Sequence, residues 1–383
     1  MAEREQDEPA GRKHLPALDG LRGVAILMVM LFHYFQFDSS SSPPLRFTYK
    51  LFQSGWAGVN LFFVLSGFLI TGILLDSKGS PRYFRNFYIR RVLRIFPLYY
   101  ASLFLLFVLL PHIHWSICER YRAAVPYQWW YWGYSHNLLV ALHNGGPPAA
   151  DHFWSLAVEE QFYLLWPLLV LLCNRQGLMI TCMAAIISAP LWRLGIYHYF
   201  AWDSWRLKVL TISQVDSIAC GALVACLLKS KIRPAILVRA MTRVGILSGF
   251  AIAMMYLYVH SFSEKSPIFY TIGLTVFALF FSSILTIAVC GTSTGIFMRC
   301  LESRALRFFG KYSYGLYVCH VPIMVAALDL HFTSISISGY PHNPLIGKWC
   351  WALLMLGSSV VCALLSWNLL ENRFLKLKSK LAP

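Results

Sequence analysis

Two residues of the first apolar segment, Arg22 and His33 in DGLRGVAILMVMLFHY, have types and a spacing that could support chemistry. Eleven residues of α-helix return to nearly the same face, and they place His33 roughly 16 Å deeper than Arg22. Ionisable groups inside a bilayer are costly and usually face a cavity. An anion held by the guanidinium could therefore extend an arm towards an imidazole that acts as a base near neutral pH. The alternative is an arginine that reaches the membrane surface and an unrelated, hydrogen-bonded core histidine.

A second cluster precedes Pro97 in RNFYIRRVLRIFPLYY. Arginine binds phosphate through a planar fork of donors. Arg91 and Arg94 share a helix face, and we expect them to reach the same membrane mouth as Arg22. A phosphate on a long flexible tether describes coenzyme A, whose thioester lies at the far end. The alternative is that these charges only set the membrane topology.

A third cluster lies in DHFWSLAVEEQFYLLWP, where Asp151 and His152 are predicted at the outer surface and Glu159 and Glu160 about two turns further in. Two adjacent carboxylates inside a span are hard to keep ionised without donors. We therefore expect one of them to pair with an arginine of a span or to bind an acceptor hydroxyl, and the other to be protonated. A purely structural ion pair is the alternative.

Three further polar residues lie in apolar segments and are predicted to contribute to substrate binding. Asp216 lies in QVDSIACGALVAC, beside small residues that permit close helix approach. Asn60 gives GWAGVNLFFVLSGFLITG a polar group. His320 forms a polar stripe with Ser313 and Tyr317, at spacings of three and four residues. A packed, hydrogen-bonded histidine is the alternative for His320.

The elements that must position these residues are membrane helices. Apolar residues make up 57% of the 383 residues and charged residues only 13%, half the charged share of an average soluble domain. Several apolar runs approach the length that crosses a bilayer. The sequence thus predicts an all-α, polytopic membrane bundle of about ten helices, over residues 19–37, 54–75, 95–113, 151–173, 177–199, 209–228, 244–261, 268–290, 312–330 and 347–370.

The net charge of +16 is distributed as membrane topology requires. With both termini in the cytoplasm, 24 Lys and Arg fall in cytoplasmic segments and 8 in outer ones, the bias that the positive-inside rule predicts. This distribution favours membrane lipids as partners over nucleic acid. We expect a single membrane domain over residues 1–383, with cytoplasmic tails at 1–18 and 371–383. The ten cysteines show no C-x-x-C pair, so neither a metal site nor a disulfide framework is expected.

Taken together, these segments resemble the acyltransferase type 3 family of integral-membrane O-acyltransferases, which includes bacterial polysaccharide O-acetylases. The resemblance runs from DGLRGVAILMVMLFHY through GVNLFFVLSGFLI, RRVLRIFPLYY, WSLAVEEQFYLLWP and the Asp216–Gly221 segment to YSYGLYVCHVPI and the terminal Glu371–Asn372. Two positions depart from the family pattern. Asn60 stands where members commonly have Asp, and Arg373 stands where they commonly have Pro.

The resemblance implies a ten-helix domain with acyl-CoA, most often acetyl-CoA, as the donor substrate and no bound cofactor. The family's Arg-x10-His motif falls on Arg22 and His33, with the histidine catalytic. Its R-x-x-R-I-x-P motif falls on Arg91 and Arg94, and its conserved carboxylate on Glu159 or Glu160.

We therefore expect His33 to act as the general base that activates a hydroxyl of a carbohydrate or related acceptor. Glu159 and Glu160 join it as catalytic candidates, and Arg22, Arg91 and Arg94 bind the donor. Asn60, Ser66 or an arginine are the candidate oxyanion donors. A track along the first helix from Arg22 to His33 is expected to hold the thioester carrier. A transporter or flippase is the alternative function, and it predicts no release of free thiol from acyl-CoA.

Overall fold

The computed structural model describes residues 15–35, 43–113, 118–143, 150–200, 204–291, 295–333 and 344–381, and all regular elements in these ranges are helical. Nine helical segments of this part are long and apolar enough to cross a membrane, and a shorter apolar helix, α16 (Ser313–Asp329), occupies the remaining predicted span, 312–330. The all-α, polytopic fold is therefore confirmed. The nine segments are Pro16–Tyr34, Arg46–Ser77, Tyr83–His112, Asp151–Leu172, Arg175–Phe200, Thr211–Leu228, Pro234–Val259, Phe269–Cys290 and Leu345–Leu377.

Some of these helices are longer than the predicted spans. The helix predicted over 244–261 already begins at Pro234 (α12, Pro234–Val259), because proline is favoured in the first turn of a helix. The last segment does not stop at residue 370: α18 (Pro344–Ser366) continues through a π-turn into α19 (Asn372–Leu381), so most of the predicted C-terminal tail is helical. Residues 1–14 of the predicted N-terminal tail lie outside the described residues.

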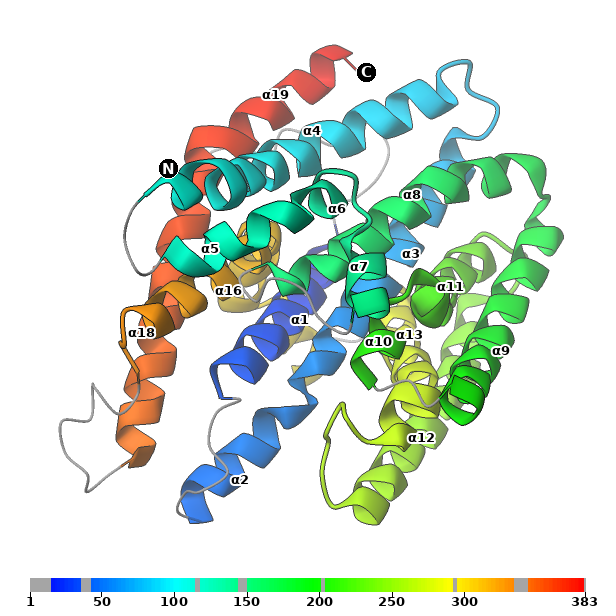
Figure 1. Cartoon of the computed structure of the whole chain (residues 1–383). Helices are drawn as coiled ribbons and strands as arrows, with labels where there is room; N and C mark the ends of the chain where they lie inside the picture. Colours follow the sequence, from blue (N-terminus) through cyan, green and yellow to red (C-terminus); the bar gives the residue numbers. More distant parts are fainter. Residues whose placement is uncertain are drawn as a thin grey trace.

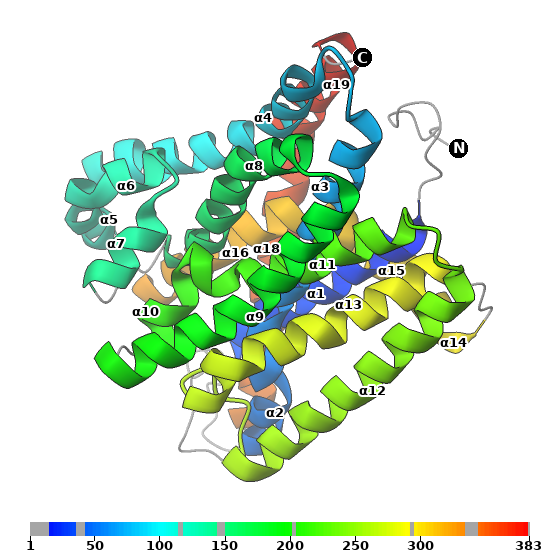
Figure 2. The ribbon, with the colours of Figure 1, turned by 90° about the vertical axis from the view of Figure 1, so that its right-hand side faces the viewer.

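Helix α1 (Pro16–Tyr34) runs through the centre of the bundle (Figure 1), where it packs against α3 (Gly58–Ser77), α15 (Arg304–Lys311) and α16. Helix α4 (Tyr83–Phe104) lies beside α19. The short helices α5 (Glu119–Ala124), α6 (Gln128–Trp132) and α7 (His136–His143) gather on one side of the molecule, away from α12 and α13 (Leu274–Cys290) (Figure 2). The two central helices α1 and α3 thus receive contacts from most of the chain.

Helices α3 and α11 (Thr211–Leu228) cross at glycines. A Cβ on Gly67 would overlap the carbonyl of Ile218, and a Cβ on Gly221 would overlap the carbonyl of Val64. The backbones are therefore closer than any other residue would allow, which confirms the predicted close approach beside Asp216.

Outside the candidate spans, α6 and α7 are joined by a buried aromatic pair. The ring of His136 stacks on Tyr131 with 4.3 Å between ring centroids, and both side chains have 0% exposure. Burial lowers the pKa of His136 from 6.5 to about 3, because the charged imidazolium cannot be solvated there.

Candidate active site

A cavity of about 110 Å³ lies between α1, α3, α4, α8 (Trp154–Leu172) and α16. It brings together residues that are far apart in the sequence and that were predicted to act together. Its polar lining consists of Arg22, Ser66, Arg91, Arg94, Ser155, Glu159, Glu160, Tyr163, Ser313, Tyr314 and Tyr317. The rest of the lining is apolar and comes mainly from α3.

The three predicted arginines line this cavity. Arg22 donates a hydrogen bond to Asp19 Oδ1 over 3.1 Å, and the guanidinium carbon of Arg91 lies 5.5 Å from the centroid of the Tyr163 ring. Arg94 is the most exposed of the three. Their predicted convergence is confirmed, whereas their role in donor binding stays a prediction. Three guanidinium groups around one opening make an anion site for several phosphate oxygens.

The two carboxylates of α8 differ in their surroundings. Glu159 accepts hydrogen bonds from Ser66 Oγ over 2.5 Å and from the hydroxyl of Tyr163 over 3.3 Å. Glu160 Oε1 is buried and has no hydrogen-bond partner among the described residues. Ser66, a predicted oxyanion donor, therefore has its proton committed to Glu159, and Glu160 keeps a free acceptor atom for a ligand.

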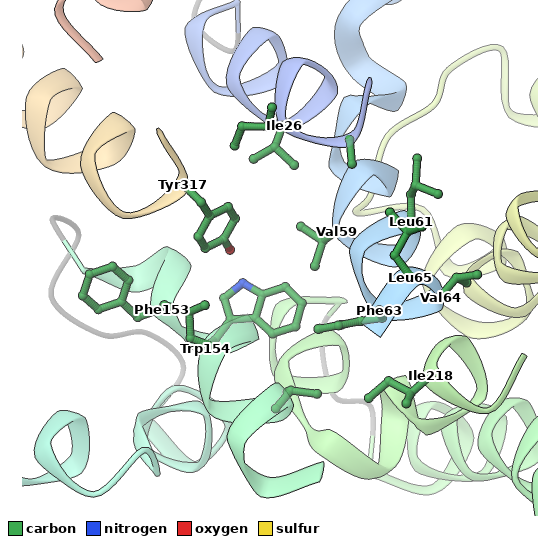
Figure 3. Packing of buried hydrophobic residues seen from close by; sticks show 14 of the residues in the cluster. Ile26, Val59, Leu61, Phe63, Val64, Leu65, Phe153, Trp154, Ile218 and Tyr317 are labelled. Atoms are coloured by element: carbon green, nitrogen blue, oxygen red, sulfur yellow. The ribbon is translucent and has the colours of Figure 1, made fainter. Parts of the chain in front are cut away.

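The inner end of the cavity is closed by Ser155 and Tyr317, whose hydroxyl oxygens are 2.6 Å apart. The hydroxyl of Tyr317 donates to the carbonyl of His152 over 2.8 Å, so Ser155 supplies the proton of the bond between the two hydroxyls. Figure 3 shows Tyr317 of α16 and Trp154 of α8 pointing towards one another, with Val59 and Phe63 of α3 beside them. We call Ser155 and Tyr317 the cavity floor. Neither was predicted as a site residue, although the polar stripe contained Tyr317.

His33 does not line the cavity. Its ring lies behind the floor: Tyr317 contacts His320 with 5.5 Å between ring centroids, and His320 contacts His33 with 5.0 Å. The predicted track from Arg22 to His33 is therefore wrong as a continuous space, because the cavity ends one layer of rings before the imidazole. Helical periodicity placed two residues on one side of α1, but it could not show which side chains of α16 fill the space between them.

His33 is part of a group of three imidazoles that we call the histidine cluster: His33 of α1, His152 of the turn before α8, and His320 of α16. The centroids of His152 and His320 are 5.1 Å apart. His33 is half-buried, whereas His320 and His152 are 0% and 4% exposed. His152, predicted at the outer surface, is thus a buried residue beside the predicted base, and the sequence reasoning did not include it in the site.

Asn60 and Asp216 lie apart from the cavity lining. Asn60 Nδ2 donates to Ser217 Oγ over 2.9 Å, across the crossing of α3 and α11. Asp216 forms an ion pair of 2.8 Å with Arg193 of α9 (Arg175–Phe200), and both side chains have 0% exposure. Their positions support a role in holding helices together, and their predicted contribution to substrate binding receives no support from the geometry.

A buried lysine surrounded by a carboxylate and three tryptophan rings was also not identified from the sequence. Lys208 of α10 (Ser204–Val209) is 5% exposed and lies 2.5 Å from Glu264. Its ammonium group lies 5.5 Å from the ring of Trp56 and 5.6 Å from the rings of Trp154 and Trp205. Cation–π contacts of this kind stabilise a desolvated ammonium group. No sequence signal links these positions, since they come from four separate segments.

No group of three or more His, Cys, Asp or Glu side chains is placed to hold a metal ion in the part of the chain that the structure describes.

Comparison with known proteins gives a family for this arrangement. A family profile described as an acyltransferase domain matches residues 15–368. The peptidoglycan O-acetyltransferase OatA of Listeria monocytogenes is 26% identical over 374 residues, covering 94% of this chain and 56% of that protein. The O-acetyltransferase OatA of Staphylococcus aureus is 29% identical over 332 residues, covering 82% of this chain and 51% of its own length. The chain thus spans about half the length of the curated relatives it matches.

No solved structure matches the chain. The match to the acyltransferase profile covers far more than half of the 383 residues and includes every residue of the cavity lining and of the histidine cluster. This chain therefore belongs to the acyltransferase type 3 family.

Proposed function

We propose that this membrane protein transfers an acyl group, acetyl in the simplest case, from acyl-CoA to a hydroxyl group of a carbohydrate acceptor. The relatives named above as O-acetyltransferases support the acyl transfer, and the name of one of them supports a peptidoglycan-like acceptor. The donor is argued from this chain's own cavity.

The observation that carries the proposal is the convergence of Arg22, Arg91 and Arg94 on one cavity. The phosphates of coenzyme A bind these guanidinium groups at the mouth. The tether then extends between the apolar side chains of α3, and the thioester reaches the floor formed by Ser155 and Tyr317. The guanidinium groups match the charged end of this donor, and the hydroxyl groups of the floor lie where its thioester would arrive.

His33 acts as the general base in this proposal. Its Nδ1 lies 2.8 Å from the carbonyl of Val29. A carbonyl can only accept, so Nδ1 carries the proton and Nε2 keeps the lone pair. His33 Nε2 takes the proton of the acceptor hydroxyl as its oxygen attacks the thioester carbon, the C–S bond breaks, and the proton passes to the leaving thiolate. Because the floor separates His33 from the cavity, the ring of Tyr317 must swing aside for the two substrates to meet.

We place both termini on the cytoplasmic side of the membrane, as the distribution of Lys and Arg favours. The cavity mouth with its arginines then opens where acyl-CoA is made. Reporter fusions at each terminus test this orientation, and an extracytoplasmic signal from either one contradicts it.

The test is release of free thiol from acetyl-CoA by the purified protein in lipid vesicles, with and without a glycan acceptor. Arg91→Gln and Arg94→Gln are expected to raise the KM for acetyl-CoA about tenfold or more each, since a hydrogen bond between charged groups contributes about 1.5–3 kcal/mol. Arg85→Gln is the matched control, because Arg85 is exposed on the same helix and does not line the cavity. A wild-type protein that moves a solute but releases no thiol would be a transporter.

A further inference from the structure

Two nitrogen atoms of the histidine cluster, His152 Nδ1 and His320 Nε2, are buried and have no hydrogen-bond partner among the described residues. Buried polar atoms without a partner are rare in native proteins, and each one requires an explanation. The two rings contact each other, and the ring of His320 also contacts His33. The site of acyl transfer therefore contains two polar atoms that the protein itself does not satisfy.

Hydrogen bonds to backbone carbonyls determine that both of these nitrogen atoms are acceptors. His152 Nε2 lies 3.3 Å from the carbonyl of Val318, and His320 Nδ1 lies 2.7 Å from the carbonyl of Tyr317. Both carbonyls can only accept, so these two nitrogens carry the protons. In the neutral rings, His152 Nδ1 and His320 Nε2 are then acceptors. Together with His33 Nε2, the cluster presents three lone pairs and no donor of its own.

We propose that His152 and His320 bind the acceptor through hydroxyl groups that neighbour the reacting one. A ligand that satisfies two acceptors beside the base must bring at least two donors as well as the attacking hydroxyl, which describes a polyol such as a sugar unit. The inference rests on the proposed function for the reaction and assigns the residues that hold its carbohydrate acceptor. The half-buried edge of His33 is the accessible part of the cluster, so the sugar approaches from that side and acyl-CoA from the arginine side.

Four substitutions separate this role from a structural one, because Asn and Gln place their amides at the positions of Nδ1 and Nε2 respectively. His152→Gln and His320→Asn keep the donor to the backbone carbonyl and remove the free acceptor. His152→Asn and His320→Gln do the reverse. Acceptor binding should therefore suffer in the first two variants, and thermal stability should suffer in the other two.

The probe is the tetramer of N-acetylglucosamine, and its binding to the full chain in detergent is measured by calorimetry without a donor. We expect His152→Gln and His320→Asn each to raise the Kd about three- to tenfold, the loss of one hydrogen bond between neutral groups. His152→Asn and His320→Gln should stay within about twofold of the wild type. The KM for the tetramer should follow the same order in the transfer assay, with the KM for acetyl-CoA unchanged.

Three results would each overturn the proposal. Binding could weaken in His152→Asn and His320→Gln, which lose the donor to the backbone carbonyl, rather than in the other two variants. All four variants could bind the tetramer equally, or the wild type could fail to bind it. Equal binding would mean that ordered water alone occupies the cluster. A wild type that binds the tetramer in the predicted order but releases no thiol from acetyl-CoA would contradict the proposed function and leave this sugar site intact.

Discussion

The ion pair between α9 and α11 provides a prediction whose size follows from the geometry. Arg193 has 0% exposure and donates to Asp216 Oδ2 over 2.8 Å, to Thr275 Oγ1 over 2.6 Å, and to the carbonyls of Thr271 and Ser213. Arg193→Met fills much of the same space but leaves the Asp216 carboxylate buried without a counter-charge. Removal of one partner of a buried pair costs about 3–5 kcal/mol, whereas an exposed pair contributes about 0–1 kcal/mol.

Asp216→Asn in the Arg193→Met background removes that uncompensated charge. In the wild type, Thr275 donates to Asp216 Oδ2 over 2.6 Å, and the amide oxygen of Asn can still accept this hydrogen bond. The double variant should therefore recover about 2 kcal/mol of the loss. The assay is unfolding of the purified protein in mixed micelles by titration with a denaturing detergent, followed by tryptophan fluorescence.

The single variants Arg193→Met and Asp216→Asn are measured beside the double variant. If the stability loss of the double variant equals the sum of the two single losses, the reasoning is refuted, because independent sites show no coupling. Activity supplies a second criterion. Asp216 lies apart from the cavity lining, so the folded double variant should transfer acyl groups within about threefold of the wild-type rate. A double variant that folds but does not transfer acyl groups would support the original prediction that Asp216 contributes to substrate binding.

Three further predictions concern single residues. His33→Ala should lower turnover by about 10²–10⁴-fold, the usual contribution of a general base, and thiol release at the wild-type rate by a folded variant would refute this role. Gly221→Ala should lower the yield of folded protein in a size-exclusion profile, because the added Cβ would overlap the backbone of α3. Gly195→Ala is the control, because a Cβ added to Gly195 has no neighbouring atom within 4 Å. His136→Phe should keep the stack on Tyr131 and make stability less sensitive to acid. Folding lowers the pKa of His136 to about 3, so the wild type loses stability as pH falls from 6.5 towards 3, and equal losses in a pH series of thermal melts would contradict this.

The sequence predicted the helices and the arginine side of the cavity well. Apolar runs of about 20 residues are a strong signal for membrane helices, and most predicted spans match within a few residues. Arg22, Arg91 and Arg94 were expected at one mouth because each lies at or near the cytoplasmic end of a predicted span, and Arg91 and Arg94 share a helix face. The position of a residue along its own membrane segment can be read from that segment alone, and this information was sufficient to bring the three arginines to one side of the membrane.

The inner part of the site depends on which helices are neighbours, and single segments do not carry that information. Asp216 was considered without Arg193 because their pairing needs α9 beside α11. His152 was placed by its position at the end of a helix, whereas the contact with α16 buries it beside His320. The same reason explains why the cavity floor was missed: Tyr317 and Ser155 meet only when α8 and α16 pack together.

The closed inner end of the cavity has a consequence for the membrane as a whole. Until the ring of Tyr317 swings aside, a charged donor can enter from the arginine side without opening a water-filled path past His33, because hydroxyl and aromatic groups of the floor fill the space between. Ions and protons therefore do not leak along this route while the floor is closed. A cell could then pass an energy-rich carbon fragment through its bilayer while it keeps the electrochemical gradient across that bilayer intact.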